Sequence, residues 1–201
     1  MNRAQRRNAK SQTGGSKIGR WIAYGTVILV IAGIIAAIGY SNQATRLASL
    51  PPAIAVITPG QIAPEFTATT NAGPFDLDKA TKPVLLEVFA TWCPHCQHET
   101  RIMNNLYSRY GKSIDIVAVS GSNMASDRQS PESQNDVDAF AAYFGVRYPI
   151  GYDASLSVAN AYLQGGFPTI VMIDREHRVL DIGSGEIAQS KLERWIHQAA
   201  P

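Results

Sequence analysis

The segment Val84-Leu-Leu-Glu-Val-Phe-Ala-Thr-Trp-Cys-Pro-His-Cys96 places two cysteines directly after an apolar run. Residues 84–89 have the composition of a short strand that is buried on both faces. The apolar residues of 94–110 then have the spacing of a helix, and a glycine follows at residue 111. A C-x-x-C pair beside such a strand–helix pattern is a redox signature. The segment therefore predicts that Cys93 and Cys96 exchange disulfides at the start of a helix.

The position of Cys93 at the helix start favours a reactive thiolate. Pro94 suits the first helical position, where its missing N–H costs nothing. The unpaired N–H groups and the positive end of the helix favour a negative charge on the Cys93 sulfur. A protonated His95 adds positive charge nearby, so Pro94 and His95 are expected to tune the redox chemistry. Cys96 lies one turn further along and is expected to be the more buried, resolving thiol.

Two other uses of these cysteines compete with exchange chemistry. A purely structural disulfide would close a ring over only two intervening residues, so it would stabilise the fold little. Zinc is the other alternative, because four potential ligands lie within six residues, namely Cys93, His95, Cys96 and His98. On a helix, however, the two imidazoles project roughly 140–200° away from Cys93, which disfavours one tetrahedral ion. Neither a metal nor an organic cofactor is therefore expected.

Strands and helices alternate outward from this segment. A hairpin is predicted around residues 71–73. Further strands are expected at 114–119, 169–173 and 179–182, further helices at 136–144 and 190–199, and a polar surface loop at 121–135. This order predicts an α/β domain with right-handed crossovers and a sheet covered on both faces.

The net charge of +2 is unevenly distributed along the 201 residues. The first 20 residues carry six basic side chains and no acid, which leaves 12 basic and 16 acidic groups, a balance of −4, in residues 21–201. A basic excess that is confined to a tail does not make a nucleic-acid-binding surface. No nucleic-acid partner is therefore expected.

The uncharged run at residues 21–40 predicts one transmembrane helix. As a helix it would span roughly 30 Å, the thickness of the hydrocarbon core. The basic residues precede it, so the positive-inside rule places residues 1–20 in the cytoplasm as a tail. Residues 41–63 then form a linker, and residues 64–201 form a domain outside the cytoplasm. A cleaved signal peptide is the alternative, although its apolar region is usually only about 7–15 residues long.

Several segments together resemble thioredoxin-fold proteins, specifically the membrane-anchored TlpA/ResA-like disulfide reductases. They are Ala63-Pro-Glu-Phe66, residues 84–96, Glu99, Tyr143-Phe-Gly-Val146, Gly166-Phe-Pro-Thr169 and Ile173-Asp174. The resemblance covers about residues 62–198. It implies a thioredoxin-like fold, with a central mixed sheet flanked by helices, that exchanges disulfides with protein substrates in the bacterial envelope. It also implies a redox-active Cys93–Cys96 disulfide and a membrane thiol relay of the CcdA/DsbD type as electron donor.

The resemblance assigns roles to further residues. Pro168 matches the family's cis-proline, whose loop lies beside the disulfide and docks the substrate, together with Phe167 and Trp92. Glu87 takes the place of thioredoxin's buried acid, where burial should raise its pKa and let it accept the proton of Cys96. Glu99 matches an acid near the active site of ResA-like proteins. The alternatives are a trans turn proline, a strand-edge Glu87 that faces solvent, and a solvated Glu99 in the first helical turn.

The direction of exchange is where the sequence departs from the family pattern. Pro94-His95 is similar to the dipeptide of DsbA-type oxidants, whereas the reductases commonly have Glu-Pro or Pro-Pro. Phe167 stands where thioredoxin has Ile. We expect disulfide reduction, for example during cytochrome c maturation, with a DsbA-like oxidant and a thiol-based metallochaperone as alternatives. A peroxidase is disfavoured, because Leu86 and Ala90 stand where peroxiredoxins have Pro and Thr.

Overall fold

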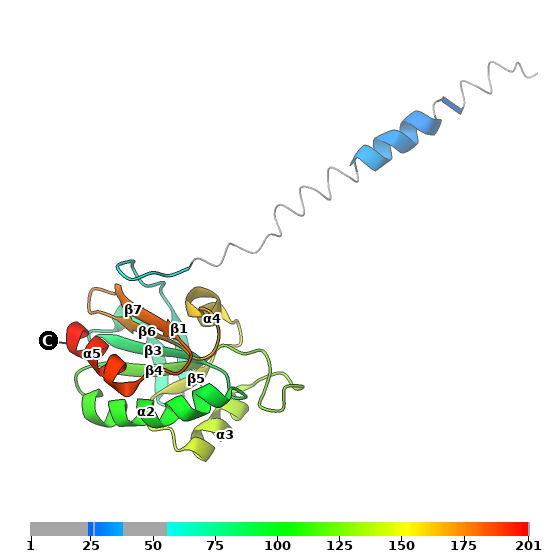
Figure 1. The fold of residues 1–201 in the computed structure, drawn as a ribbon. Coiled ribbons are helices and arrows are strands. Elements are labelled where there is room, and N and C mark those ends of the chain that lie inside the picture. The colour runs from blue at the N-terminus through cyan, green and yellow to red at the C-terminus, as the bar shows by residue number, and fades with distance from the viewer. Residues whose placement is uncertain (1–23, 26, 38–55, 201) are drawn as a thin grey trace, which may run out of the picture. The chain divides into compact units, whose positions relative to one another are not determined.

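The computed structural model describes residues 24–25, 27–37 and 56–200 (Figure 1). The chain divides into two units, residues 1–53 and 54–201. In the first unit, residues 24–25 and 27–37 are helical, while the predicted tail, the ends of the predicted anchor and most of the linker lie outside the described residues. Among the described helices, none combines the length and the apolar character that crossing a membrane requires. The anchor stays a prediction.

In the described part of the second unit, seven strands form one sheet in the order β2-β1-β5-β4-β3-β6-β7 (Figure 1). The strands are β1 (Thr67–Thr70), β2 (Gly73–Asp76), β3 (Val84–Phe89), β4 (Asp115–Ser120), β5 (Ile150–Tyr152), β6 (Thr169–Ile173) and β7 (Val179–Ser184). Strand β3 pairs parallel with β4 and antiparallel with β6. The sheet is therefore mixed, as predicted, and the strand before the cysteines lies near its centre.

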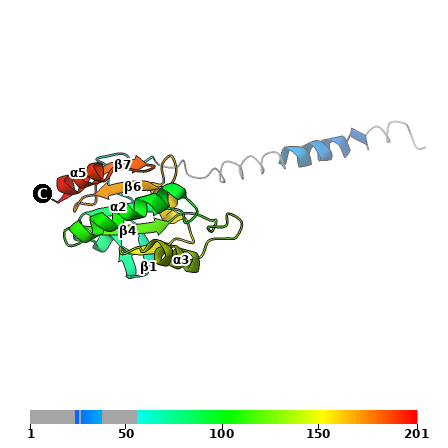
Figure 2. The same ribbon diagram turned by 60° about the horizontal axis from the view of Figure 1, so that its bottom comes forward.

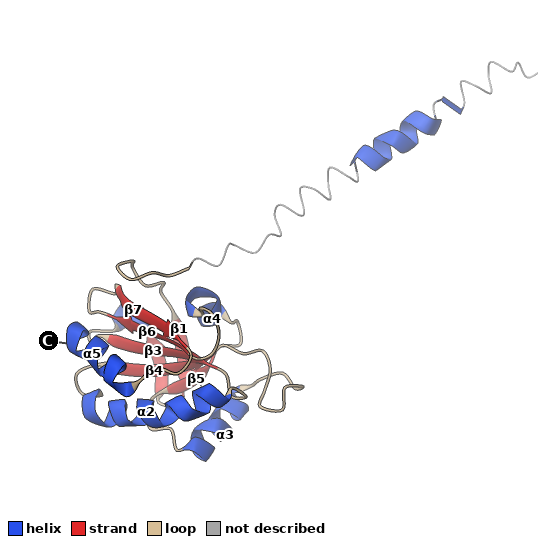
Figure 3. Cartoon of the chain, viewed as in Figure 1, coloured by secondary structure: helices blue, strands red, loops and turns tan. Residues whose placement is uncertain are grey.

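Helices cover both faces of the sheet (Figures 2 and 3). Side chains of α2 (Pro94–Tyr110), α3 (Gln134–Phe144) and α5 (Gln189–Ala199) pack in one core cluster with Leu85 and Phe89 of β3. Helix α4 (Ser157–Tyr162) and the 3-10 turn η1 (Leu77–Lys79) contribute to a second cluster with the alternate residues of β3. Because successive side chains of a strand point to opposite faces, β3 supplies both cores, which explains why five of its six residues are apolar.

Between α3 and β6, the structure adds two elements that the sequence pattern did not reveal. Strand β5 and helix α4 lie between α3 and β6, where no element was predicted. Strand β5 has three residues and α4 has six, so neither is long enough to establish a period. Strand β5 nevertheless joins the N-terminal hairpin to the sheet, because it pairs with both β4 and β1.

The folded unit includes residues that were expected in the linker. Ile57 is only 4% exposed, and its carbonyl accepts a hydrogen bond from Gln164 Nε2 at 2.7 Å. The backbone N–H groups of Gly60 and Ala63 donate to the carbonyls of Val179 at 2.7 Å and His177 at 2.8 Å. Residues 57–63 therefore extend the folded part beyond the predicted start at residue 64, because they bond to the first residue of β7 and to the turn that precedes it.

Candidate active site

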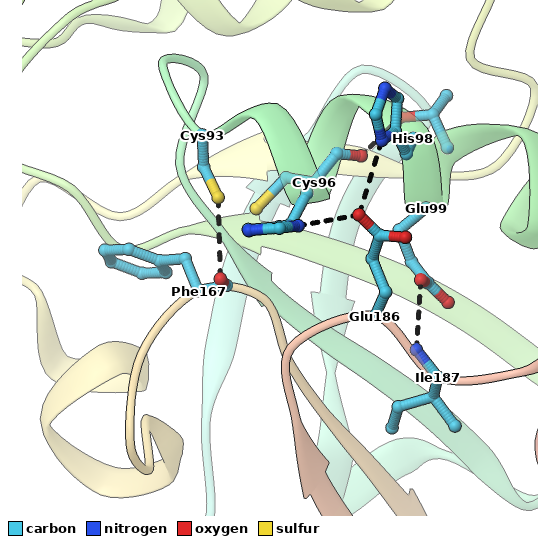
Figure 4. Close-up of polar contacts among 9 residues, drawn as sticks. Cys93, Cys96, His98, Glu99, Phe167, Glu186 and Ile187 are labelled. Atoms are coloured by element: carbon cyan, nitrogen blue, oxygen red, sulfur yellow. Dashed lines mark hydrogen bonds and ion pairs between the residues drawn. The ribbon is translucent and has the colours of Figure 1, made fainter.

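Cys93 is the N-cap of α2, and Pro94 is the first helical residue, as predicted. Both cysteines are free thiols. Cys93 is 4% exposed and Cys96 is 1% exposed, so the order of burial is the predicted one but the contrast is small. The Sγ atom of Cys93 donates to the carbonyl oxygen of Phe167 at 3.4 Å (Figure 4). The sulfur expected to react therefore lies against the loop expected to dock substrates.

The docking loop is held in place by its own polar contacts. The peptide bond between Phe167 and Pro168 is cis, so the alternative of a trans turn proline is wrong. Thr169 Oγ1 donates to the carbonyl of Gly166 at 2.9 Å, and Gly185 N–H donates to the carbonyl of Pro168 at 2.8 Å. These bonds fix the Phe167 carbonyl beside Cys93.

Glu87 lies buried beneath the helix that carries the cysteines. It is 2% exposed and occupies the same face of β3 as Leu85 and Phe89, which pack with both cysteines in one cluster. The alternative of a solvent-facing Glu87 is therefore wrong. Burial raises the pKa of Glu87 to about 8, with the charge of Glu99 adding to this effect. Burial also raises the pKa of Cys96 strongly, and the charge of Glu87 adds to it.

Glu99 is a buried residue of α2 with one unpaired oxygen. It is 0% exposed, so the alternative of a solvated helix acid is wrong. Its Oε2 atom accepts a hydrogen bond from the Ile187 N–H at 3.3 Å, whereas Oε1 has no hydrogen-bond partner among the described residues (Figure 4). Burial raises the pKa of Glu99 to about 7, and the Ile187 N–H opposes that rise. Glu99 can therefore hold or release a proton near neutral pH.

Trp92 and Phe167 form an apolar rim beside Cys93. Their rings meet edge to face, with centroids 5.8 Å apart. The indole N–H of Trp92 donates to Ser122 Oγ at 2.8 Å, and the Arg128 guanidinium lies 5.0 Å from the centre of the indole ring. Both rings are half-buried, so each retains an exposed surface that a substrate chain can contact.

The polar segment 121–135 is not the simple surface loop that was predicted. Ser122, Ala125 and Glu132 are buried, and α3 begins at residue 134. The Glu132 carboxylate accepts hydrogen bonds from Thr91 Oγ1 at 2.5 Å and from Ser120 Oγ. Burial raises the pKa of Glu132, and these two hydroxyl groups oppose the rise. Sequence reasoning missed Glu132, because an acid beside Pro131 in a polar run carries no signal of burial.

His95 and His98 both contact Glu186, which sequence reasoning also missed. The His95 Nδ1 atom lies 2.6 Å from Glu186 Oε1, and the His98 Nδ1 atom lies 3.3 Å from the same oxygen. Glu186 follows β7, about 90 residues further along the chain, so only the tertiary fold reveals this contact. Both imidazoles are thus directed to a carboxylate.

A group of possible metal ligands lies elsewhere in the domain. Glu65, Asp78 and His177 each place one ligand atom within 4.8 Å of the others. Glu65 and Asp78 are exposed, and exposed carboxylates occur commonly without an ion. We therefore assign no metal to this group.

Comparisons with known proteins cover most of the second unit. A family model described as Redoxin matches residues 58–196. The chain is 34% identical over 179 residues to "Thiol-disulfide oxidoreductase ResA" of Geobacillus kaustophilus, which covers 88% of this chain and 94% of that protein. It is 29% identical over 145 residues to the ResA protein of Bacillus thuringiensis, over 71% of this chain and 79% of that one. A crystal structure described as thiol:disulfide interchange protein DsbE of Chlorobium tepidum aligns with a TM-score of 0.63 and 26% identity, over 72% of this chain and 99% of that chain.

Proposed function

The chain belongs to the Redoxin family, and we propose that it reduces protein disulfides outside the cytoplasm through Cys93 and Cys96. Its similarity to ResA proteins makes it a thiol–disulfide oxidoreductase with a thioredoxin-like fold. The observation that supports Cys93 as the attacking residue is its place at the start of α2, with Sγ 3.4 Å from the Phe167 carbonyl and next to a cis-proline. A substrate chain that follows this loop would bring its own sulfur to Cys93.

In the first step, the Cys93 thiolate attacks one sulfur of a substrate disulfide. A bond forms between Cys93 and that sulfur, and the other substrate sulfur leaves as a thiolate that takes up a proton. The helix N-terminus stabilises the negative charge on Cys93 before attack. Trp92 and Phe167 supply an apolar surface for the side chains that flank the substrate cysteine.

In the second step, Cys96 attacks Cys93 and releases the reduced substrate. The Cys93–Cys96 disulfide forms, and the enzyme has given two electrons to the substrate. Cys96 must lose its proton first, although burial strongly favours the protonated thiol. Glu87 has a pKa of about 8 and lies close enough for its charge to act on Cys96. We assign Glu87 as the proton acceptor of this step.

One specific observation favours oxidation of substrate thiols instead of reduction of substrate disulfides, namely the presence of His95 between the two cysteines. The dithiol would then be the product, and the protein would be a DsbA-like oxidant that forms disulfides. The reduction potential separates the two: a value near about −120 mV is that of the strong oxidant DsbA, and a value below about −250 mV is that of a reductase such as thioredoxin. We favour the reductase because the similarity to a ResA protein covers 88% of this chain.

The proposed location rests on the N-terminal sequence. Six basic residues in positions 1–20 precede the uncharged run at 21–40, which favours a single-pass anchor with the catalytic domain outside the cytoplasm. In that location the domain would draw electrons from a membrane thiol relay of the CcdA/DsbD type. Its substrates would be envelope proteins, such as those handled in cytochrome c maturation.

Trapping the mixed disulfide tests the proposal. The Cys96→Ala variant lacks the resolving thiol, so it should accumulate a covalent adduct with its substrate that dithiothreitol releases. The Cys93→Ala variant is the matched control and should form no such adduct, because the remaining thiol is the resolving one. Adducts of equal yield in both variants would contradict the assignment. Zinc binding by the reduced protein, without reduction of insulin disulfides, would favour the metallochaperone instead.

A further inference from the structure

Glu186 joins two histidines of the helix that carries both cysteines. Its Oε1 atom lies 2.6 Å from His95 Nδ1 and 3.3 Å from His98 Nδ1 (Figure 4). The hydrogen bond with His95 lowers the pKa of Glu186 most, and that with His98 lowers it further. The carboxylate is thus ionised at neutral pH. His95 lies between the two cysteines, so Glu186 contacts a residue that we expect to tune the redox couple.

The backbone around Glu186 is fixed on both sides, which distinguishes this contact from an ordinary surface ion pair. Ser184 Oγ donates to the carbonyl of Gly166 at 3.0 Å, and Gly185 N–H donates to the carbonyl of Pro168 at 2.8 Å. On the other side, Ile187 N–H donates to the buried Glu99 at 3.3 Å. Exposed pairs contribute little when two flexible side chains must be ordered. Here the backbone on both sides of Glu186 is bonded, to the docking loop through Ser184 and Gly185 and to α2 through Ile187.

We propose that Glu186 is a positioning residue that holds the His95 imidazole away from Cys93 and so lowers the reduction potential of the Cys93–Cys96 couple. A protonated imidazole that turned toward Cys93 would donate to its thiolate and stabilise the reduced form. Stabilising the reduced form makes a couple more oxidising. In the structure, the polar contact of His95 is with Glu186 and that of Cys93 is with the Phe167 carbonyl. Glu186 therefore allows a reductase to contain the dipeptide Pro94-His95, which is similar to that of DsbA-type oxidants.

The inference rests on the proposed dithiol chemistry and predicts a shift in its equilibrium. We would equilibrate the full-length protein with glutathione buffers at a pH of about 6. Glu186→Gln should favour the dithiol form by at least about threefold, which is about 14 mV at 29.6 mV per tenfold change. Glu193→Gln is the matched control. Glu193 also pairs with α2, but at Arg109 near the far end of the helix, so its loss should leave the equilibrium unchanged.

Repeating the Glu186→Gln substitution in the His95→Ala variant shows whether Glu186 acts through His95. In His95→Ala, the further change Glu186→Gln should no longer move the equilibrium, because no imidazole remains to be released. An unchanged or lowered potential in Glu186→Gln, or an equal rise in the His95→Ala background, would overturn the inference. Failure of the proposed reductase function would look different, because the wild-type protein itself would then have a reduction potential near about −120 mV.

Discussion

At the residue scale, the site is defined by carboxyl groups in unequal surroundings. Glu87 and Glu99 are buried beneath or within the helix that carries the cysteines, and burial raises the pKa of each. Glu186 is exposed, and contact with two imidazoles lowers its pKa. The buried groups can hold protons near neutral pH, whereas Glu186 stays charged. We therefore propose that the same functional group transfers a proton at Glu87 and positions an imidazole at Glu186.

Glu87 should make the folded protein less stable as the pH rises. In the folded state it keeps its proton up to a pH of about 8, whereas in the unfolded chain it loses the proton near a pH of about 4.3. The folded state thus binds more protons between these values, so its stability falls as the pH rises through this window. The urea midpoint should therefore fall less between pH 5 and pH 8.5 in Glu87→Gln than in the wild type. Equal declines would contradict the assignment.

The same substitution should slow the resolving step. Without a proton acceptor beside Cys96, release of substrate from the mixed disulfide should slow by on the order of 10²-fold. Stopped-flow measurements would separate this step from the initial attack by Cys93, which should change little. An equal decrease in the rates of both steps would show that Glu87 supports the site only through packing.

Glu132 should contribute to stability through its two hydroxyl partners. Glu132→Ala leaves the hydroxyl groups of Thr91 and Ser120 buried without this acceptor, which should lower the free energy of unfolding by about 2–3 kcal/mol. Glu132→Gln keeps one acceptor oxygen and should cost less. Glu176→Ala removes an exposed acid and serves as the control in urea unfolding. An equal effect of Glu132→Ala and Glu176→Ala would exclude a stabilising network.

At the element scale, α2 and the docking loop meet because neighbouring strands deliver them to the same end of the sheet. Strand β3 leads into α2 at Cys93, and its antiparallel partner β6 begins directly after Pro168. Val88, near the end of β3, pairs with Thr169, the first residue of β6, so the end of β3 lies beside the start of β6. The register of these two strands therefore places the cis-proline loop beside the cysteines.

Gly151 should be essential for attaching the N-terminal hairpin. A Cβ atom at this position would lie 2.1 Å from the Thr69 carbonyl oxygen, so β5 and β1 would have to separate. Gly151→Ala should destabilise the fold by about 1–3 kcal/mol, which thermal or urea unfolding would measure. The reactivity of Cys93 should stay unchanged, because β1 and β5 lie away from β3 in the sheet order. An unchanged unfolding midpoint would contradict the close approach.

At the scale of the whole molecule, the chain combines a folded redox unit with an N-terminal unit of different character. Residues 54–201 form a compact unit that contains every residue of the candidate site. The basic tail and the apolar run at 21–40 fall in the other unit. Catalysis and location should therefore be separable by truncation.

Removal of residues 1–53 should release the protein from the membrane without changing its redox equilibrium. The full-length protein should sediment with membranes and be extracted by detergent but not by high salt, as expected for an apolar anchor. The truncated protein should remain soluble and retain the potential of the full chain in glutathione buffers. A full-length protein that stays in the soluble fraction would contradict the proposed anchor.

The amino-acid order alone was enough to predict the α/β class, the central strand and the helix that begins directly after Cys93. These features depend on local signals: a run of apolar residues, a helix start and a motif of fixed spacing. The burial of Glu99 and Glu132 and the contact of Glu186 with His95 depend instead on the tertiary structure. A carboxyl group has the same local signature whether it is solvated or buried, and only packing between distant segments sets its surroundings. Burial and charge in those surroundings then decide which acids hold a proton.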